Sequence, residues 1–389
     1  MLARPWHNGA VRHPALHPPS PWIQGPRYDL LFFGGALALG LLAVLGVLVL
    51  GLPPAIALWF WIVGFDGPHM AAAYSRTYLD RDMWRTRRPL LLGVLVAFAT
   101  GPAFLALNAL TRSQAPFALY LGLMAIYGYH HIVRQHWGFC ALYASRGAGD
   151  PAARGREARI DKLVLHAGCW IPYVHFLASH PSCRAALGLG APLRPETWFF
   201  RALGVLFAGL LVVYLVRARA RVFGVKDAYL LGTVAFHGGA YFLVARFEPV
   251  FPGAKGPDQE FMLLSVMVAL FHATQYVAIV WAHNARRYGA ADDARIHGLA
   301  RVVSGSPARY AAWVLGFSVV LYFPLACATG VYPVFHALAG RELGPFVSVN
   351  QVALAVFWGI ALHHYWLDER IWKIGRDTGT RAALLGPSA

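Results

Sequence analysis

The chain alternates long apolar runs with short polar connections from residue 29 to residue 372. A window of about 20 apolar residues, the length with which a helix spans the hydrocarbon core of a bilayer, fits this region ten times. The predicted membrane helices cover, approximately, residues 29–51, 55–78, 89–110, 116–143, 161–179, 198–216, 227–245, 260–284, 310–332 and 347–372. We therefore predict an all-α fold, a polytopic membrane helical bundle of about ten transmembrane helices.

The connections between these helices are too short to hold a separate folded domain. We expect a polar N-terminal tail rich in Pro and His at residues 1–27, a single transmembrane helical domain at 28–375, and a C-terminal tail at 376–389. The N-terminal tail lacks the short apolar core that a cleavable signal peptide needs. The first membrane helix is therefore expected to stay in place.

The composition agrees with a membrane protein. Hydrophobic residues make up 58% of the chain and charged residues 13%, whereas a soluble domain carries about 25% charged residues. This excludes a soluble globular enzyme and a disordered protein. The cysteines, at positions 140, 169, 183 and 327, form no CxxC motif and no framework of a small extracellular domain. Neither a zinc ribbon nor a disulfide scaffold is indicated.

The net charge of +16 is spread along the chain in short basic groups. They form no single basic patch, so we expect no nucleic-acid partner. Of the 34 Lys and Arg residues, 26 fall in the two tails and in alternate connections, and 6 fall in the remaining connections. Because basic residues accumulate on the cytoplasmic side, both termini are predicted to be cytoplasmic. The expected location is the bacterial inner membrane.

Polar residues inside the predicted helices are concentrated in four of them. The clusters are Asp66 and His69; His130, His131, Arg134, Gln135 and His136; His272, Gln275 and His283; and His363, His364, Asp368 and Glu369. Such groups are costly within a bilayer and are usually retained for function. Each cluster begins 11 to 16 residues from the outer start of its helix. We expect them to meet at one depth, with the site toward the cytoplasm.

Imidazole and carboxylate groups gathered in this way are a set of metal ligands, sufficient for two ions. The predicted metal ligands are Asp66, His69, His130, His131, His136, His272, His283, His363 and His364. Asp66 and His69 share a helix face, and so do His364 and Asp368, as ligand pairs or carboxylate-to-histidine pairs require. Pro68 is expected to kink its helix and so to aim His69.

Spacing limits what these residues can do together. His272 and His283 share a face but lie about 16 Å apart along the helix, too far to hold one ion. Neighbouring histidines in each HH doublet point about 100° apart, so one of each is expected to face the metal. Arg134 and Asp368 are predicted catalytic residues, and Arg134 is expected to pair with Asp66 or Asp368 or to hold an anionic substrate group. The isolated histidines at 166, 175, 180, 237 and 336 are interpreted as packing residues.

His131 and His136 stand as HxxxxH, which is similar to the first histidine box of desaturases. In its clusters the chain resembles the histidine-rich integral-membrane di-iron proteins: fatty acid desaturases and hydroxylases, alkane hydroxylases and, more loosely, the carotene-cleaving Brp/Blh oxygenases. The HxxHH boxes that those families have next are missing, HHYWLDER takes the place of the last one, and ten helices exceed the usual number in desaturases. The resemblance implies two non-haem irons that activate dioxygen.

The chain contains none of the fingerprints GxxxxGK[ST], GxGxxG, CxxCH or GxSxG, so no flavin, nicotinamide or ATP site of its own is indicated. Electrons are then expected from a separate reductase or a ferredoxin-type donor. The leading hypothesis is an oxygen-dependent oxidoreductase, that is an oxygenase, hydroxylase or desaturase, acting on a lipophilic small molecule among membrane lipids. The alternatives are a haem-b or quinone-linked electron-transfer protein and a histidine-lined metal or proton transporter.

Overall fold

The structure, a computed structural model, describes residues 20–146, 151–186, 189–220, 223–246, 257–289, 294–329, 341–373 and 377–385. The helices are α1 (Pro26–Asp29), α2 (Gly35–Leu48), α3 (Pro54–Trp61), α4 (Gly67–Ser75), α5 (Arg81–Gly93), α6 (Thr100–Thr111), α7 (Ala115–Arg146), α8 (Pro151–Ser179), α9 (Pro181–Ala186), α10 (Arg194–Arg219), α11 (Val225–Gly238), α12 (Pro257–Gly289), α13 (Ala294–His297), α14 (Leu299–Val303), α15 (Pro307–Thr329), α16 (Val349–Ile371) and α17 (Thr378–Leu385). A short antiparallel hairpin of β1 (Glu342–Gly344) and β2 (Val347–Ser348) precedes α16. The predicted all-α class is confirmed.

Several helices continue into one another through turns of a different pitch. The π-helical turns Leu30–Gly34 and Ile62–Asp66 join α1 to α2 and α3 to α4, and the 3-10 turn Val94–Ala99 joins α5 to α6. The π-helical turn Gly239–Leu243 and the 3-10 turn Val244–Arg246 extend α11. With these connections, continuous helical stretches of the described residues overlap each of the predicted ranges.

Four helical stretches among the described residues are long and apolar enough to cross a membrane: Pro26–Leu48, Arg81–Thr111, Arg194–Arg219 and Leu264–Gly289. The other predicted spans do not meet the combined criterion of length and hydropathy in the described residues, and Pro307–Phe323 of α15 is apolar but too short. For α7 the physical reason is plain, because its histidines, Arg134 and Gln135 lower the mean hydropathy. The residues that build the site are therefore also those that weaken the membrane signal.

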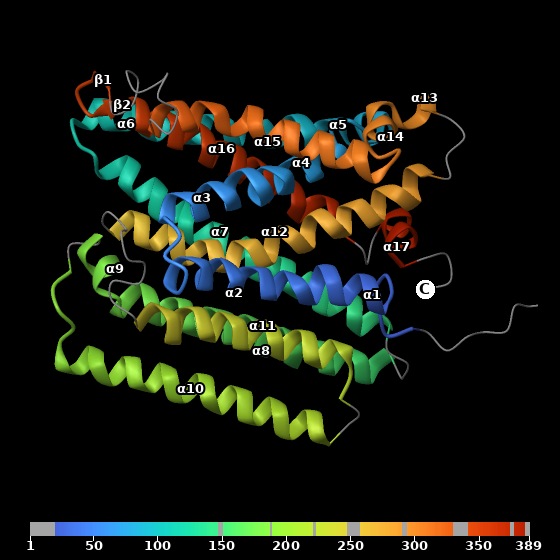
Figure 1. Cartoon of the computed structure of the whole chain (residues 1–389), viewed down its shortest axis with the longest axis horizontal. Helices are drawn as coiled ribbons and strands as arrows, with labels where there is room; N and C mark the ends of the chain where they lie inside the picture. The colour runs from blue at the N-terminus through green and yellow to red at the C-terminus, as the bar shows by residue number, and fades with distance from the viewer. Residues whose placement is uncertain are drawn as a thin grey trace, which may run out of the picture.

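The helices run along the long axis of the molecule in successive layers (Figure 1). The α10 helix lies along one edge, α8 and α11 lie next to it, and α2, α7 and α12 occupy the middle. The α6, α15 and α16 helices lie at the opposite edge, and α1 and α17 lie at the same end of the bundle. The helices that carry the four polar clusters, α4, α7, α12 and α16, contact one another between the middle layer and this opposite edge.

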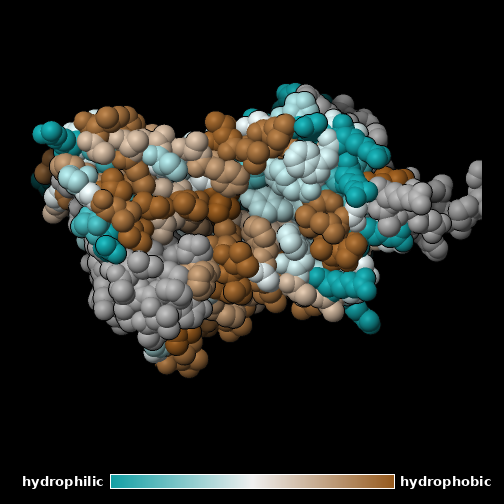
Figure 2. Space-filling view, turned by 90° about the horizontal axis from the view of Figure 1, so that it is seen from above, coloured by the Kyte–Doolittle hydropathy of each residue, from teal (hydrophilic) through white to brown (hydrophobic). Residues whose placement is uncertain are grey.

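The surface carries large apolar side chains between two hydrophilic ends (Figure 2). On α10, Val205, Val213 and Val216 are 73%, 60% and 63% exposed. A soluble protein rarely exposes apolar surface so extensively, whereas lipid chains cover it at no cost. These exposed side chains and the four apolar helices indicate that the protein associates with a membrane.

Close contacts of glycine with a neighbouring backbone set the position of two helices that carry the site. A Cβ atom at Gly40 of α2 would lie 2.5 Å from the carbonyl oxygen of Met267 on α12. A Cβ atom at Gly101 of α6 would lie 2.4 Å from the carbonyl oxygen of Ala355 on α16. Small residues let membrane helices approach in this way. The positions of α12 and α16 thus depend on these glycines.

The interruption expected near Pro68 is a π-helical turn directly before it. The N–H of Gly67 bonds the carbonyl of Ile62, which leaves the carbonyl of Val63 facing Pro68, a residue without an N–H. The hydroxyl of Ser318 on α15 donates to this carbonyl at 2.7 Å. The turn is therefore stabilised by a neighbouring helix, and α4 continues beyond it with His69 in its first turn.

The first and last described segments of the chain pack against the bundle. The carbonyl of Leu384 on α17 accepts hydrogen bonds from Arg286 at 2.6 Å and from Gln24 at 3.0 Å. Leu384 is fully buried, and Ile23 is almost so. The predicted C-terminal tail thus includes a helix held on α12, whereas the first 19 residues of the predicted N-terminal tail lie outside the described residues.

Candidate metal centre

Three helices bring a group of metal-ligand side chains together. His69 of α4, His131 of α7, and His364 and Asp368 of α16 are all buried, and each offers one ligand atom that lies within 4.8 Å of the others. The Nε2 atoms of His69 and His364 are 2.9 Å apart. Two nitrogens on one ion, each at roughly 2.1 Å, lie about 3 Å apart when the angle between them is near 90°. The separation thus fits two adjacent ligands.

A direct N–H···N hydrogen bond between the two rings would have the same length, so this distance alone does not indicate a metal ion. The hydrogen-bond partners of the other ring nitrogens distinguish the two cases better. Nε2 of His131 is buried and has no hydrogen-bond partner among the described residues. Buried polar atoms are nearly always satisfied. The unpartnered nitrogen of His131, beside the close Nε2 pair of His69 and His364, favours an ion as the missing partner.

His272 of α12 lies against the same group. Its ring centroid is 4.5 Å from that of His69 and 5.1 Å from that of His131. Its Nδ1 atom is also buried and unpartnered. The amide nitrogen of Gln135 donates to the His272 carbonyl at 2.8 Å and ties α7 to α12 at this level. Histidines from all four predicted clusters thus meet at one depth.

Asp368 is held by a short relay of side chains. The hydroxyl of Tyr276 donates to its Oδ1 at 2.5 Å, and the indole N–H of Trp372 donates to that hydroxyl at 3.3 Å. The other carboxylate oxygen lies 3.5 Å from Nε2 of His364. Such outer contacts orient a ligand and tune its basicity. Tyr276 and Trp372 were not predicted, because apolar aromatic residues carry no sequence signal for this role.

His136, a predicted ligand, lies beside the group and not within it. Its ring centroid is 6.4 Å from that of His272 and 5.5 Å from that of His237 on α11. His237 is fully buried, and the interpretation of it as a packing residue overlooked this position. A lone histidine in an apolar helix has no neighbour in the sequence that could have revealed it.

Each HH doublet contributes one ring to the group. His130 is half-buried and packs near Tyr127, outside the group. His363 has both ring nitrogens engaged, with the hydroxyl of Tyr74 at 3.1 Å from Nδ1 and that of Tyr78 at 2.7 Å from Nε2. The predicted metal roles of His130 and His363 therefore do not fit this geometry, because neighbouring residues on a helix point in different directions.

His283 is also separate from the group. It lies three turns along α12 from His272, and its Nδ1 contacts the side-chain oxygen of Asn284 at 3.0 Å. Asp66 accepts a hydrogen bond from Tyr322 and lines a cavity beside His69 without joining the ligand group. The axial rise along α12 explains the first result, and the hydrogen bond to Tyr322 on α15 holds Asp66 apart from the group.

Arg134 pairs with neither Asp66 nor Asp368. Its Nη1 donates to Oε1 of Glu369 at 3.0 Å, and its side chain is 45% exposed. The predicted ion pair with an aspartate is wrong because Asp368 is buried in the bundle, whereas Glu369, the next residue, is partly exposed. Arg134 therefore lies at the exposed edge of the site, which we call the rim.

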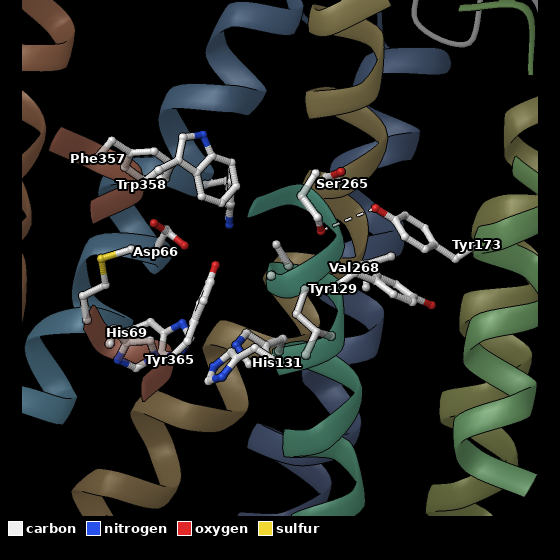
Figure 3. Close-up of a pocket in the computed structure, with 18 of the residues that line it drawn as sticks. Asp66, His69, Tyr129, His131, Tyr173, Ser265, Val268, Phe357, Trp358 and Tyr365 are labelled. Atoms are coloured by element: carbon white, nitrogen blue, oxygen red, sulfur yellow. Dashed lines mark hydrogen bonds between the residues drawn. The ribbon is translucent and has the colours of Figure 1, made fainter. Parts of the chain in front are cut away.

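Two cavities border the ligand group. The smaller one, of about 90 Å³, lies among His69, His131, Asp66 and Tyr365, and the Tyr365 hydroxyl points into it toward Asp66 (Figure 3). The larger one, of about 610 Å³, extends from the ligand group to the rim. Its lining combines ligand-group residues and apolar side chains with rim charges: His131, Tyr276 and Asp368; Trp137, Phe139, Leu142, Ile279 and Leu385; and Arg134, Glu369, Lys373 and Arg381.

Comparison with known proteins gives no match, neither with a family model nor with a curated protein or a solved structure. The chemistry of the site therefore rests on its own residues. Three histidines and one carboxylate are a donor set that suits Fe²⁺ or Zn²⁺, and a His/carboxylate set with open positions is typical of non-haem iron oxygenases. The buried group is a candidate metal-binding site of a membrane-associated protein.

Proposed function

We propose that the protein is an integral-membrane non-haem di-iron oxidoreductase that uses dioxygen to modify a lipophilic substrate. The observation that carries this proposal is the buried group of His69, His131, His364 and Asp368, in which two Nε2 atoms lie 2.9 Å apart and Nε2 of His131 has no partner among the described residues. Iron bound there would supply the activation of dioxygen. The residues around it would hold the ligands in place and exclude water.

The larger cavity supports a substrate that is mostly apolar. At about 610 Å³ it falls within the usual range of ligand pockets, roughly 300 to 1,000 Å³. Its inner end reaches Asp368 and its lining includes Phe139 and Ile279, whereas Lys373 and Arg381 lie along it too. An alkyl or isoprenoid chain would fill the apolar part and leave a polar end near the basic residues.

The same proposal includes ten membrane spans, cytoplasmic termini and a site that opens to the cytoplasm of a bacterium. The alternation of Lys and Arg along the chain supports it. The common end of α1 and α17 in Figure 1 agrees with an even number of spans. Arg381 and Leu385 of α17 line the larger cavity, so its rim lies toward that end. Electrons would come from a separate reductase or ferredoxin-type donor.

The geometry favours this function over a haem protein. Axial histidines on opposite faces of a haem iron have nitrogens separated by about twice a metal–nitrogen bond of roughly 2 Å, whereas Nε2 of His69 and His364 are 2.9 Å apart. The rings also pack against one another, with centroids 4.4 Å apart. A porphyrin would have to separate them.

The first experiment is metal analysis of the protein purified in detergent, together with its visible spectrum and its oxygen uptake with a chemical reductant. Near two irons per chain, no Soret band, and oxygen uptake stimulated by a lipid extract are the expected results. His364→Ala should abolish the uptake. A protein with a Soret band, or one that binds iron but consumes no oxygen with any lipid fraction, would contradict the proposed function.

A further inference from the structure

A second pair of histidines lies beside the first ligand group. His136 and His237 are fully buried, and their ring planes are nearly perpendicular, at 87°. The Nε2 atom of each ring has no hydrogen-bond partner among the described residues. Buried polar atoms without partners are rare, so we expect a ligand to bind these two nitrogens.

The hydrogen bonds of Tyr129 determine which nitrogen of His237 carries the proton. The single hydroxyl hydrogen of Tyr129 is donated to the carbonyl of Cys169 at 2.7 Å. The same oxygen lies 2.7 Å from Nδ1 of His237, so this contact requires an N–H donor at Nδ1. A neutral His237 then has no hydrogen on Nε2, which presents a lone pair.

A second series of hydrogen bonds determines which nitrogen of His136 carries the proton. The amide nitrogen of Gln275 donates to the carbonyl of Phe33 at 3.0 Å, which orients its oxygen toward Tyr229. The Tyr229 hydroxyl donates to that oxygen at 3.2 Å and therefore accepts from Nδ1 of His136, 3.0 Å away. The Nε2 atom of His136 is thus also a bare lone pair.

We propose that Nε2 of His136 and Nε2 of His237 bind a second divalent transition-metal ion next to the first group. At a metal–nitrogen distance of about 2.1 Å, two imidazole ligands of one ion have ring centroids roughly 4.5 to 6.4 Å apart. The observed separation is 5.5 Å. Histidines that ligate metals commonly donate their other N–H to an oxygen, as both of these do.

His272 connects this position to the first group. Its ring centroid lies 6.4 Å from that of His136 and 4.5 Å from that of His69, and its Nδ1 is unpartnered. The second position thus has fewer protein ligands and wider spacing than the first. Imidazole ligands suit Fe²⁺, Co²⁺ and Zn²⁺. The inference depends on the proposed function only for the identity of the metal as iron.

Titration of the full-length, metal-free protein in detergent with Co²⁺ tests this, because the visible bands of bound Co²⁺ report its ligands independently of any activity. The wild type should bind two Co²⁺ per chain. His237→Ala and His69→Ala should each bind one, whereas His166→Ala, a change on α8 away from both groups, should bind two.

Tyr129→Phe provides a conservative variant in case His237→Ala does not fold. It removes the acceptor of the His237 N–H and should weaken one of the two sites by about 10- to 100-fold. A single Co²⁺ per wild-type chain, removed by His69→Ala, would mean that a buried water satisfies the pair and would overturn the inference. Two bound Co²⁺ whose affinities are unchanged in both His237→Ala and Tyr129→Phe would also overturn it.

Discussion

The Nε2 atoms of His69 and His364 lie 2.9 Å apart, although 295 positions separate the two residues in the sequence. His364 is therefore expected to be essential for the first metal position. The variant His364→Ala should lose one metal equivalent per chain, as measured by elemental analysis after purification, because the group keeps only two histidines and a carboxylate.

His363→Ala is the matched control for this change, since it alters the adjacent residue of the same helix. It removes hydrogen bonds with Tyr74 and Tyr78. The free energy of unfolding should therefore fall by about 1 to 3 kcal/mol, which lowers the unfolding temperature, and the metal content should be unchanged. Equal metal loss in the two variants would show that the doublet acts only through the stability of α16.

Asp368→Asn should weaken the first metal position while retaining the shape of the side chain. The carboxylate lies beside His364 and is oriented by Tyr276. We expect a loss of about 10- to 100-fold in metal affinity, measured by competition with a chelator. Asp66→Asn, which changes a carboxylate outside the ligand group, should bind the metal as the wild type does, and a similar loss there would argue against this assignment.

Gly40→Ala should destabilise the bundle, because its Cβ would lie 2.5 Å from the backbone of Met267. Forcing α2 away from α12 should cost about 1 to 3 kcal/mol, measured by thermal unfolding in detergent. Gly209→Ala on α10 meets no atom within 4 Å, so its unfolding temperature should stay the same or rise. Equal effects at both positions would exclude the close contact as the cause.

The attachment of α17 should depend on pH. Burial raises the pKa of Asp377, but hydrogen bonds from Thr380 and the charge of Arg87 outweigh it and hold the pKa below its ordinary value. A lowered carboxyl pKa stabilises the folded state above the ordinary value of about 3.9, and this stabilisation is lost as the pH falls through the lowered value.

Hydrogen exchange of residues 378–385 at pH 7 and pH 3, corrected for intrinsic rates, measures this effect. Protection should decrease at the lower pH. Asp377→Asn keeps a side chain that can cap α17 but cannot titrate, so its corrected protection should be the same at both pH values. A decrease of the same size in this variant would assign the pH effect to another group.

The helices and the four polar clusters could be predicted, because polar residues are conspicuous in apolar segments and basic residues mark the connections. The rotation of each helix about its own axis could not be predicted from the sequence. His131 and His130 differ by about 100° in direction, and only packing against α4, α12 and α16 decides which of them meets His69. The same rotation separates Asp368 from Glu369.

Other parts of the site leave no trace in the sequence at all. His237 stands alone among apolar residues, and its relation to His136 depends on the contact between α11 and α7. Tyr276 orients Asp368 from another helix. Such residues are common in membrane helices, so their functional contacts become visible only when the helices are packed together.

The ligands of the first group come from α4, α7 and α16, and α16 is the last of the long helices in the chain. During synthesis His69 is translated long before His364 and Asp368. A nascent chain therefore has one imidazole of this group, then two, and gains the remaining pair only at the end. The complete set of four side chains, and any metal site that it forms, therefore exists only after α16 has been made and packed against α4 and α7.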